Sequence, residues 1–239
     1  FGQCCDMYKI KLIAEKYNLF VIEDAAQSIG AQVIGNTLDN HFSGTIGDLG
    51  ITSFYPSKNL GCFGDGGAVL TNNNQLAEQV RLIANHGQRE RYTHEIVGMN
   101  SRLDAIQAVT LSTKLKYLDD CNHLRYQAAL RYTNELSSLH WLNTPYCSNV
   151  STHVFHQYSV VLNRDVNRLD FQEYLLRYDI PTMIYYPKPV HRQVAYQSFS
   201  KENCPVSEKL AEHIISLPMH SELTIEQIDF ICKTIKRFS

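Results

Sequence analysis

The stretch LFVIED, at positions 19–24, decides the fold that the sequence predicts. Its first four residues form an apolar run of strand length, and such a run is typical of a buried strand in a parallel sheet. The run stops at Glu23 and Asp24, so a carboxylate stands where the strand ends. Because ligands of open α/β sheets bind beyond the carboxyl ends of the strands, Asp24 is a candidate site residue.

The neighbouring segments extend this α/β pattern along the chain. Upstream, Asp6 is placed to cap a helix whose apolar residues recur every three or four positions up to Tyr17. Downstream, residues 51–55 and 68–71 are typical of strands, and Pro56 stops the first of them. Further helices are expected at 75–85, 122–138, 170–178 and 210–215. Two more are expected to follow the capping-box pair Ser101 and Asp104 and the capping pair Thr224 and Gln227. Further strands are expected at 154–162 and 181–186.

The order of these elements predicts three parts. Residues 1–120 are expected to form an α/β domain with a mixed, mostly parallel sheet. Residues 121–151 form a long connecting helix and a linker, and residues 152–239 form a small α+β domain. No internal repeat accompanies this order.

Composition excludes several classes of function. The 239 residues carry 22 Lys and Arg against 24 Asp and Glu, a balance that argues against a nucleic-acid partner. No apolar run reaches the roughly 18 residues of a membrane span, so no membrane partner is expected. Seven scattered cysteines without a CxxC pair favour a reduced, cytoplasmic protein. His153 and His156 form an HxxH pair without further ligands, so we expect no metal site.

Polar residues follow two of the predicted strands and are candidates for one site. Asp24 and Gln27 follow the first strand, and Ser53 and Lys58 lie at and beyond the end of the second. A carboxylate and an amine at neighbouring strand ends could face one cavity. Each also has a plainer interpretation, because Asp24 could cap a turn and Lys58 could be a surface lysine. The residues by themselves leave an α/β enzyme of unassigned chemistry.

Longer motifs in a fixed order resemble the DegT/DnrJ/StrS family of sugar aminotransferases. They are VIEDAAQS at 21–28, SFYPSKNLG at 53–61, GDGGA at 64–68, GMNSRLDAIQA at 98–108, YYPKPVH at 185–191 and LPMH at 217–220. The resemblance implies the aspartate-aminotransferase type I fold of pyridoxal phosphate (PLP) enzymes and a homodimer with shared active sites. Residues 1–120 would then be the C-terminal part of the large PLP-binding domain.

The resemblance also implies a role for each candidate residue. Lys58 matches the lysine that holds PLP covalently and moves a proton, and Asp24 matches the carboxylate that keeps the pyridine nitrogen protonated. Gln27 matches a residue at the ring and its phenolic oxygen. Ser53 matches a phosphate ligand, and Asn100 matches a phosphate contact supplied by the neighbouring subunit. Arg102, Tyr186 and His191 match residues near the sugar substrate.

The implied reaction moves an amino group from L-glutamate to a keto group of a nucleotide-linked sugar, for amino-sugar and surface polysaccharide biosynthesis. The sequences NSRLD at 100–104 and NHGQ at 85–88 look like those of members that aminate carbon 3. These members act on UDP-2-acetamido-2-deoxy-3-keto-hexuluronate-type substrates, whose carboxylate Arg102 could pair with. A 4-keto-sugar aminotransferase of the same family is the alternative substrate class.

The family's N-terminal portion has no counterpart in this sequence, and Phe1 matches a point inside the large domain. The missing portion supplies early strands and a further phosphate-binding motif in relatives. We therefore expect the sequence to be a fragment of a longer enzyme. The alternative from another class is a truncated, non-catalytic interaction or regulatory chain. An NAD-dependent Rossmann enzyme is disfavoured, because the glycines at 61–67 open into a strand rather than a helix.

Overall fold

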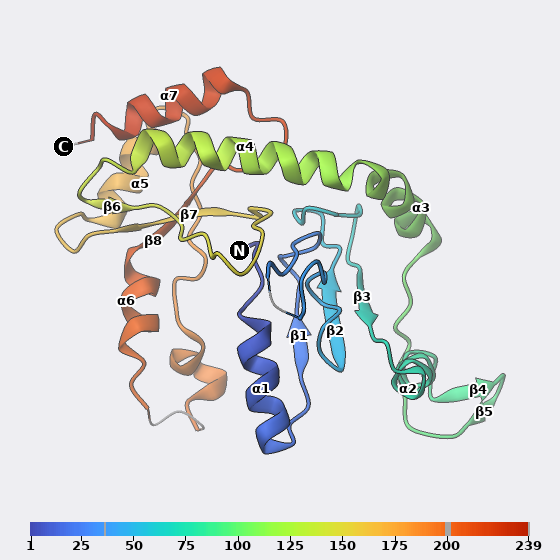
Figure 1. Ribbon diagram of the computed structural model, residues 1–239. Coiled ribbons are helices and arrows are strands. Elements are labelled where there is room, and N and C mark those ends of the chain that lie inside the picture. The colour runs from blue at the N-terminus through green and yellow to red at the C-terminus, as the bar shows by residue number, and fades with distance from the viewer. Residues whose placement is uncertain (36, 199–201, 239) are drawn as a thin grey trace. The chain divides into compact units, whose positions relative to one another are not determined.

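The computed structural model describes residues 1–239 except 36, 199–201 and 239, and it divides into two compact units (Figure 1). The N-terminal unit comprises Gly2–His123 and Cys147–His156. The C-terminal unit comprises Phe1, Leu124–Tyr146 and Gln157–Ser239. The sequence-based domain limits at 120/121 and 151/152 stay a prediction.

Helix α1, Met7–Tyr17, opens the N-terminal unit and begins as the sequence predicts. The Asp6 side chain accepts a hydrogen bond from the backbone N–H of Lys9, which satisfies one of the free amides of the first turn. The helix ends at Asn18, whose φ of 52° is left-handed and whose N–H bonds back to the carbonyls of Ala14 and Glu15. Both ends of the helix are therefore encoded locally.

The sheet of the N-terminal unit has three strands in the order β1-β2-β3. Strand β1 (Ile22–Asp24) pairs in parallel with β2 (Leu49–Ser53), and β2 pairs antiparallel with β3 (Gly67–Leu70). The sheet is mixed, as predicted, and two of its strands lie close to the expected positions 51–55 and 68–71. Its register places Asp24 beside Ile51 and Ser53 beside Gly67.

The prediction of a buried strand over the LFVI run is wrong. Phe20 is 90% exposed and Ile22 is 65% exposed, while the buried side chain of β1 is Glu23. The ladder begins at Ile22. The N–H of Val21 bonds to the Asp48 side chain, and its carbonyl accepts from the N–H groups of Asp48 and Leu49. Of this run, Leu19, Phe20 and Ile22 are exposed, and only Val21 packs against the buried core.

Burial of Glu23 is compensated by three backbone donors. One carboxylate oxygen accepts from the amides of Ile46 and Gly47, at 2.5 Å and 2.7 Å, and the other accepts from Gly44 at 2.9 Å. A buried carboxylate costs much less free energy when such bonds replace its hydration. The bonds also hold the loop 44–47 against β1.

Helical segments and a hairpin complete the N-terminal unit. They are α2 (Asn74–Ala84), the hairpin β4 (Gln88–Glu90) and β5 (Thr93–His94), α3 (Ala105–Lys114) and the 3₁₀ turn η1 (Leu115–Tyr117). The prediction of a capping box at Ser101 and Asp104 is wrong. Asp104 is itself the N-cap, without a side-chain cap bond, and the N–H of Ser101 bonds to Ala84 at the end of α2.

Two hydrophobic clusters form the core of the N-terminal unit. One gathers Cys4, Met7, Ala31, Val33, Ile46 and Val154, with Val21 and Leu38 packed against it. The other gathers Leu60, Cys62, Leu111 and Leu118, with Ile29 and Phe54 packed against it. The second cluster includes Leu60 and Phe54, which lie two and four residues from Lys58 in the sequence.

The C-terminal unit is built on an antiparallel sheet in the order β6-β7-β8. Its strands are β6 (Leu142–Asn143), β7 (Tyr158–Leu162) and β8 (Ile214–Leu217). The helices are α4 (Leu118–Leu136), whose first residues belong to the N-terminal unit, α5 (Arg168–Leu176), α6 (Pro205–His213) and α7 (Ile225–Ile235). The 3₁₀ turns η2 (Val190–Arg192) and η3 (Val194–Tyr196) lie between α5 and α6.

Three sequence-based boundaries in this part differ from the structure. The strand expected at 154–162 begins only at Tyr158, because Phe155 has a φ of 42°, which no strand residue adopts. Residues 181–186 form no strand, and Met183 alone makes a bridge, to Ser216. Helix α6 ends at His213, and the buried residues Ile214–Leu217 form strand β8 rather than continuing the helix.

The last helix follows its prediction closely. The Thr224 side chain accepts from the N–H of Gln227, and the Gln227 side chain accepts from the N–H of Thr224, which completes the capping box. Across the part of the chain that the structure describes, no helix combines the length and the apolar character that crossing a bilayer requires.

Candidate active site

The ends of two parallel strands place two of the candidate residues at one edge of the sheet. Asp24 is the last residue of β1 and Ser53 is the last residue of β2. Asp24 is exposed, and one of its oxygens accepts from the N–H of Ala26 at 3.1 Å. Beyond β1, the N–H of Ala25 still bonds to the carbonyl of Ile51, so the chain leaves the sheet only after the carboxylate.

Lys58 lies in a tight turn that follows β2. Its N–H bonds to the carbonyl of Tyr55 at 2.9 Å, and its side chain is half-buried. Burial lowers the pKa of the Lys58 amine, and the nearby charge of Asp24 acts against this by favouring the ammonium form. The two predicted catalytic residues are therefore close enough to interact electrostatically, and a larger share of the amine is neutral than in an exposed lysine.

Ser53 is the last residue of β2, and Gln27 lies in the loop that follows β1. The Ser53 hydroxyl oxygen accepts from the N–H of Tyr55 at 3.2 Å, so its own hydrogen is oriented away from the turn. Gln27 is half-buried in the loop that follows Asp24. The structure thus gathers Asp24, Ser53 and Lys58 around the ends of β1 and β2, with Gln27 in the adjoining loop.

Sequence reasoning missed a polar network next to Lys58. The side chain of Asn59 bonds to Asn122, to the carbonyl of Val154 and to His156. Asn122 and His156 are each 8% exposed. The only local signal was the position of Asn59 beside Lys58, since its partners are 63 to 97 residues away in the sequence.

Asn100 and Arg102 lie elsewhere in the N-terminal unit, beside α2. Asn100 forms a bridge with Asn85, and the Arg102 guanidinium donates to the Asn85 side-chain oxygen at 3.3 Å. Both residues are exposed, and within the described part of the chain no hydrogen bond joins them to Lys58 or Asp24. The structure therefore does not gather them with the strand-end group within this chain.

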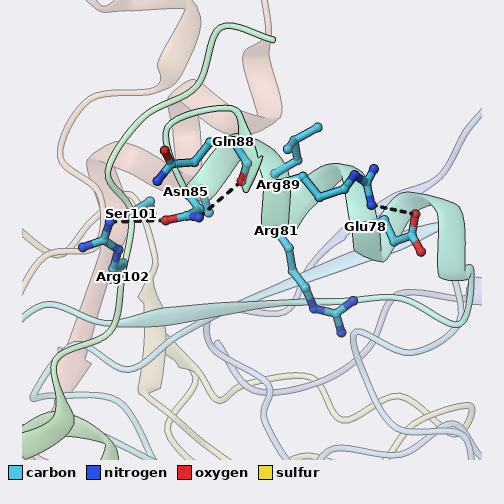
Figure 2. A pocket seen from close by; sticks show the side chains of 9 residues that line it. Glu78, Arg81, Asn85, Gln88, Arg89, Ser101 and Arg102 are labelled. Carbon is cyan, nitrogen blue, oxygen red and sulfur yellow. Dashed lines mark hydrogen bonds and ion pairs between the residues drawn. The ribbon is translucent and has the colours of Figure 1, made fainter. Parts of the chain in front are cut away.

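Arg102 lines a cavity of about 500 Å³ together with residues of α2 and β4. In Figure 2 the guanidinium of Arg89 turns toward Glu78, Arg81 points away from both, and Arg102 faces Asn85. Because the three guanidinium groups point in different directions, they do not form one anion site as they stand.

Tyr186 and His191 belong to the C-terminal unit. Tyr186 is 60% exposed and lies edge-on to the ring of Tyr185. His191 bonds through Nε2 to Glu208 at 2.8 Å, and Glu208 also receives two bonds from Arg192. These bonds hold the pKa of Glu208 below its ordinary value, so the carboxylate stays charged and fixes the His191 ring.

The residues at the strand ends fit the cofactor that the sequence implies. PLP presents an aldehyde to an amine, a ring nitrogen to a carboxylate and a phosphate to hydroxyl and amide donors. Lys58, Asp24 and Ser53 supply the amine, the carboxylate and the hydroxyl on one sheet edge. Among the described residues, no three His, Cys, Asp or Glu side chains are grouped as metal ligands, and His153 and His156 are engaged in other bonds.

Comparisons with known proteins place this arrangement in a family. The sequence model described as the DegT/DnrJ/EryC1/StrS aminotransferase family matches residues 1–236. A UDP-2-acetamido-2-deoxy-3-oxo-D-glucuronate aminotransferase of Pseudomonas aeruginosa is 41% identical over 235 residues, which are 98% of this chain and 63% of that protein.

Two solved structures resemble the chain along nearly all its length. An aminotransferase from Brucella abortus matches with a TM-score of 0.89 and 39% identity, over 98% of this chain and 61% of that one. NtdA from Bacillus subtilis, solved with the bound cofactor PMP, matches with a TM-score of 0.86 and 28% identity, over 98% and 54%. The predicted fold class is confirmed, and the chain spans less than two thirds of the length of these relatives.

Proposed function

The chain belongs to the DegT/DnrJ/EryC1/StrS aminotransferase family, and on that premise we propose that it is a PLP-dependent nucleotide-sugar aminotransferase. The reaction would move the amino group of L-glutamate to a keto group, at carbon 3, of a nucleotide-linked sugar, within amino-sugar and surface polysaccharide biosynthesis. The observation that carries the proposal is the half-buried amine of Lys58, whose pKa responds to Asp24 at the neighbouring strand end.

The residues of this chain have separate tasks in that reaction. PLP, when bound, withdraws electrons from the substrate carbon that carries the transferred nitrogen. The lowered pKa of Lys58 leaves more of its Nζ neutral, so that Nζ can accept a proton and return it. The Asp24 carboxylate stabilises positive charge beside it, and the Ser53 hydroxyl can donate to an anion. Gln27 would contact the ring from the loop beyond Asp24.

The substrate class is supported by the relative from Pseudomonas aeruginosa, whose name specifies a UDP-linked 3-oxo-glucuronate. A sugar carboxylate needs a cationic partner. Arg102 donates to the neutral Asn85 side chain, and that bond does not neutralise its charge. Tyr186 and His191 are proposed to contact the sugar. Because His191 uses Nε2 for Glu208, Nδ1 is the nitrogen that would face a ligand.

A second copy of the chain is proposed as the partner. Asn100 and Arg102 are exposed and, among the described residues, have no bond to the Lys58 group, so they suit a site completed across a homodimer. Mixing Lys58→Ala chains with Asn100→Ala chains tests this, because a shared site leaves one intact site in each mixed dimer. Activity restored by mixing supports sharing, and two inactive variants that stay inactive contradict it. With all seven cysteines free, the cytoplasm is the proposed location.

The activity itself is tested on the 239-residue chain by two half-reactions. The chain is loaded with PLP and given ¹⁵N-labelled L-glutamate, and 2-oxoglutarate is measured. The UDP-linked 3-keto sugar acid and its 4-keto counterpart are then added, and the labelled amino sugar is detected by mass spectrometry. Lys58→Ala is expected to lose at least ~100-fold in rate, while Lys116→Ala, at an exposed lysine, is the matched control. Equal rates for wild type and Lys58→Ala would contradict the proposal.

A further inference from the structure

The residue after the predicted catalytic lysine is bonded on three sides. The amide nitrogen of Asn59 donates to the Asn122 oxygen at 2.7 Å and to the carbonyl of Val154 at 3.0 Å. Its oxygen pairs with Nδ1 of His156 at 3.2 Å. Asn59 is half-buried, and Asn122 and His156 are almost fully buried. We call these three side chains the polar clamp.

The chemistry of the partners fixes the orientation of every group in the clamp. A backbone carbonyl only accepts, so the nitrogen of Asn59 must face Val154, and its oxygen then faces His156. Since that oxygen also only accepts, Nδ1 of His156 carries the hydrogen. In the same way, the nitrogen of Asn122 donates to the carbonyl of Ile29 at 3.1 Å, which leaves its oxygen for Asn59. Each bond in the clamp therefore has one consistent direction.

The clamp joins the two segments that carry the candidate catalytic groups. Asn59 belongs to the turn of Lys58, and Ile29 belongs to the loop that begins after Asp24. Asn122, near the start of α4, bonds to both segments at once. It also packs directly on Gly30, where a Cβ would lie 2.5 Å from the Asn122 nitrogen. Gly30 has a φ of 86°, so this loop is held in a conformation that favours glycine.

We propose that the polar clamp of Asn59, Asn122 and His156 positions the Lys58 amine against the Asp24 carboxylate. These are positioning residues, because they act through the backbone of the lysine turn and of the Asp24 loop. The proposal rests on the proposed function, in which Lys58 and Asp24 work as a pair. It adds residues from α4 and from the segment at 153–156, which the family motifs quoted above do not include.

A merely structural role makes a different prediction. Loss of any buried polar bond destabilises the unit, since the remaining partner is left unpaired. Only a positioning role also changes how strongly Asp24 acts on Lys58. Asp24 is the charged group that acts on Lys58, and the titratable member of the clamp is His156, which bonds to Asn59. The electrostatic coupling between Lys58 and Asp24 is therefore the quantity to measure.

The coupling is measured by the pH dependence of Lys58 acetylation with acetic anhydride, quantified by peptide mass spectrometry on the cofactor-free 239-residue chain. Asp24→Asn removes a charge that favours the ammonium form, so it should lower the apparent pKa of Lys58 by ~0.5–1 unit. In the Asn122→Ala background the same change should shift that pKa by less than half as much. Asn122→Ala alone should raise the pKa of Lys58. The variant should let water reach the amine, and burial, which lowers that pKa, influences it more strongly than Asp24 does.

Two further variants keep the test decisive if Asn122→Ala does not fold. His156→Ala should weaken the coupling, and His156→Asn should restore it, since an asparagine amide can donate from the place of Nδ1. The matched control is Thr133→Val, which removes a bond of 2.9 Å to Tyr158 in the C-terminal unit and should leave the Lys58 profile unchanged.

An undiminished Asp24 effect in folded Asn122→Ala, or in both His156 variants, would overturn the proposal. A Thr133→Val chain that loses the coupling equally would also overturn it, because the effect would then follow stability alone. The labelling uses no cofactor and no substrate. If the clamp variants behave as expected but the chain transfers no amino group, the proposed function is refuted and the clamp proposal is retained. If the chain transfers an amino group but the clamp variants keep the full Asp24 effect, only the clamp proposal is refuted.

Discussion

The two three-stranded sheets, β1-β2-β3 of the N-terminal unit and β6-β7-β8 of the C-terminal unit, differ in how much of their side-chain surface they bury. In the C-terminal unit, all four residues of β8 and four of the five in β7 are buried. In the N-terminal unit, β3 has no buried residue and Ile22, Ile51 and Val69 are 65%, 38% and 45% exposed. Buried apolar side chains therefore stabilise the C-terminal sheet. The N-terminal sheet displays apolar side chains beside its polar strand ends.

The difference shows that strand position and side-chain burial have separate causes. In the C-terminal unit, Phe171, Leu175 and Ile235 come from helices and are fully buried together with Val160 and Ile215. In the N-terminal unit, the best-anchored side chain of β1 is the carboxylate of Glu23. The C-terminal sheet is thus held by apolar packing. Strand β1 of the N-terminal sheet, which carries Asp24, is held by hydrogen bonds.

The same substitution in the two sheets should have very different effects. Ile215→Ala empties a fully buried position and should lower the free energy of unfolding by ~2–5 kcal/mol. Ile22→Ala trims a side chain that is 65% exposed and should change it by less than ~1 kcal/mol. Trp141, the single tryptophan, packs on Phe171 and reports unfolding of the C-terminal unit by fluorescence in urea.

Far-UV circular dichroism and amide hydrogen exchange follow the N-terminal unit in the same samples, because that unit contains no tryptophan. Equal losses for Ile215→Ala and Ile22→Ala would break the comparison. They would mean that the face of β1 is covered in solution.

Acid should destabilise the N-terminal unit in particular. Burial lowers the pKa of His153 to about 4, and this ring stacks on Phe155 and accepts from the N–H of Phe155. Because the folded pKa is depressed, the stabilisation is complete above the ordinary value of 6.5 and is lost as pH falls from there toward 4. This pKa shift corresponds to a loss of roughly 3 kcal/mol in the free energy of unfolding at pH values near and below 4.

The measurement is the urea midpoint of the N-terminal unit between pH 7 and pH 4. His153→Asn keeps an acceptor for Phe155 and removes the titrating ring, so its midpoint should fall less with acid. If wild type and His153→Asn lose stability in parallel, His153 is not the source of the acid sensitivity.

Glu23→Gln should have a smaller effect, and again on the N-terminal unit. An amide oxygen can replace one carboxylate oxygen, but the NH₂ group then meets a backbone N–H of the loop 44–47. One unpaired buried donor costs ~1–3 kcal/mol. Hydrogen exchange at Gly44, Ile46 and Gly47 should speed up, whereas unchanged exchange there would show that the carboxylate does not hold the loop.

The sequence allowed the strand-end residues to be predicted because they follow local rules. Asp24 was found from the point where an apolar run stops, and Ser53 from its place in the next predicted strand. The starts of α1 and α7 were found from the capping residues Asp6, Thr224 and Gln227. The exposure of Phe20 could not be read from its neighbours, because burial depends on which strands pair beside it. His156 was noticed only as part of an HxxH pair, and its contact and that of Asn122 with Asn59 gave no signal, since both depend on the folding of distant segments.

The central claim is that the turn after β2 presents Lys58 as the reactive amine of a PLP site beside Asp24. It is tested most directly by adding PLP to the 239-residue chain, reducing with borohydride and mapping the labelled peptides by mass spectrometry. The account predicts that Lys58 is labelled at the lowest PLP concentration, and that Asp24→Asn weakens this labelling without affecting Lys116. Labelling of Lys58 no better than that of the exposed lysines would contradict it.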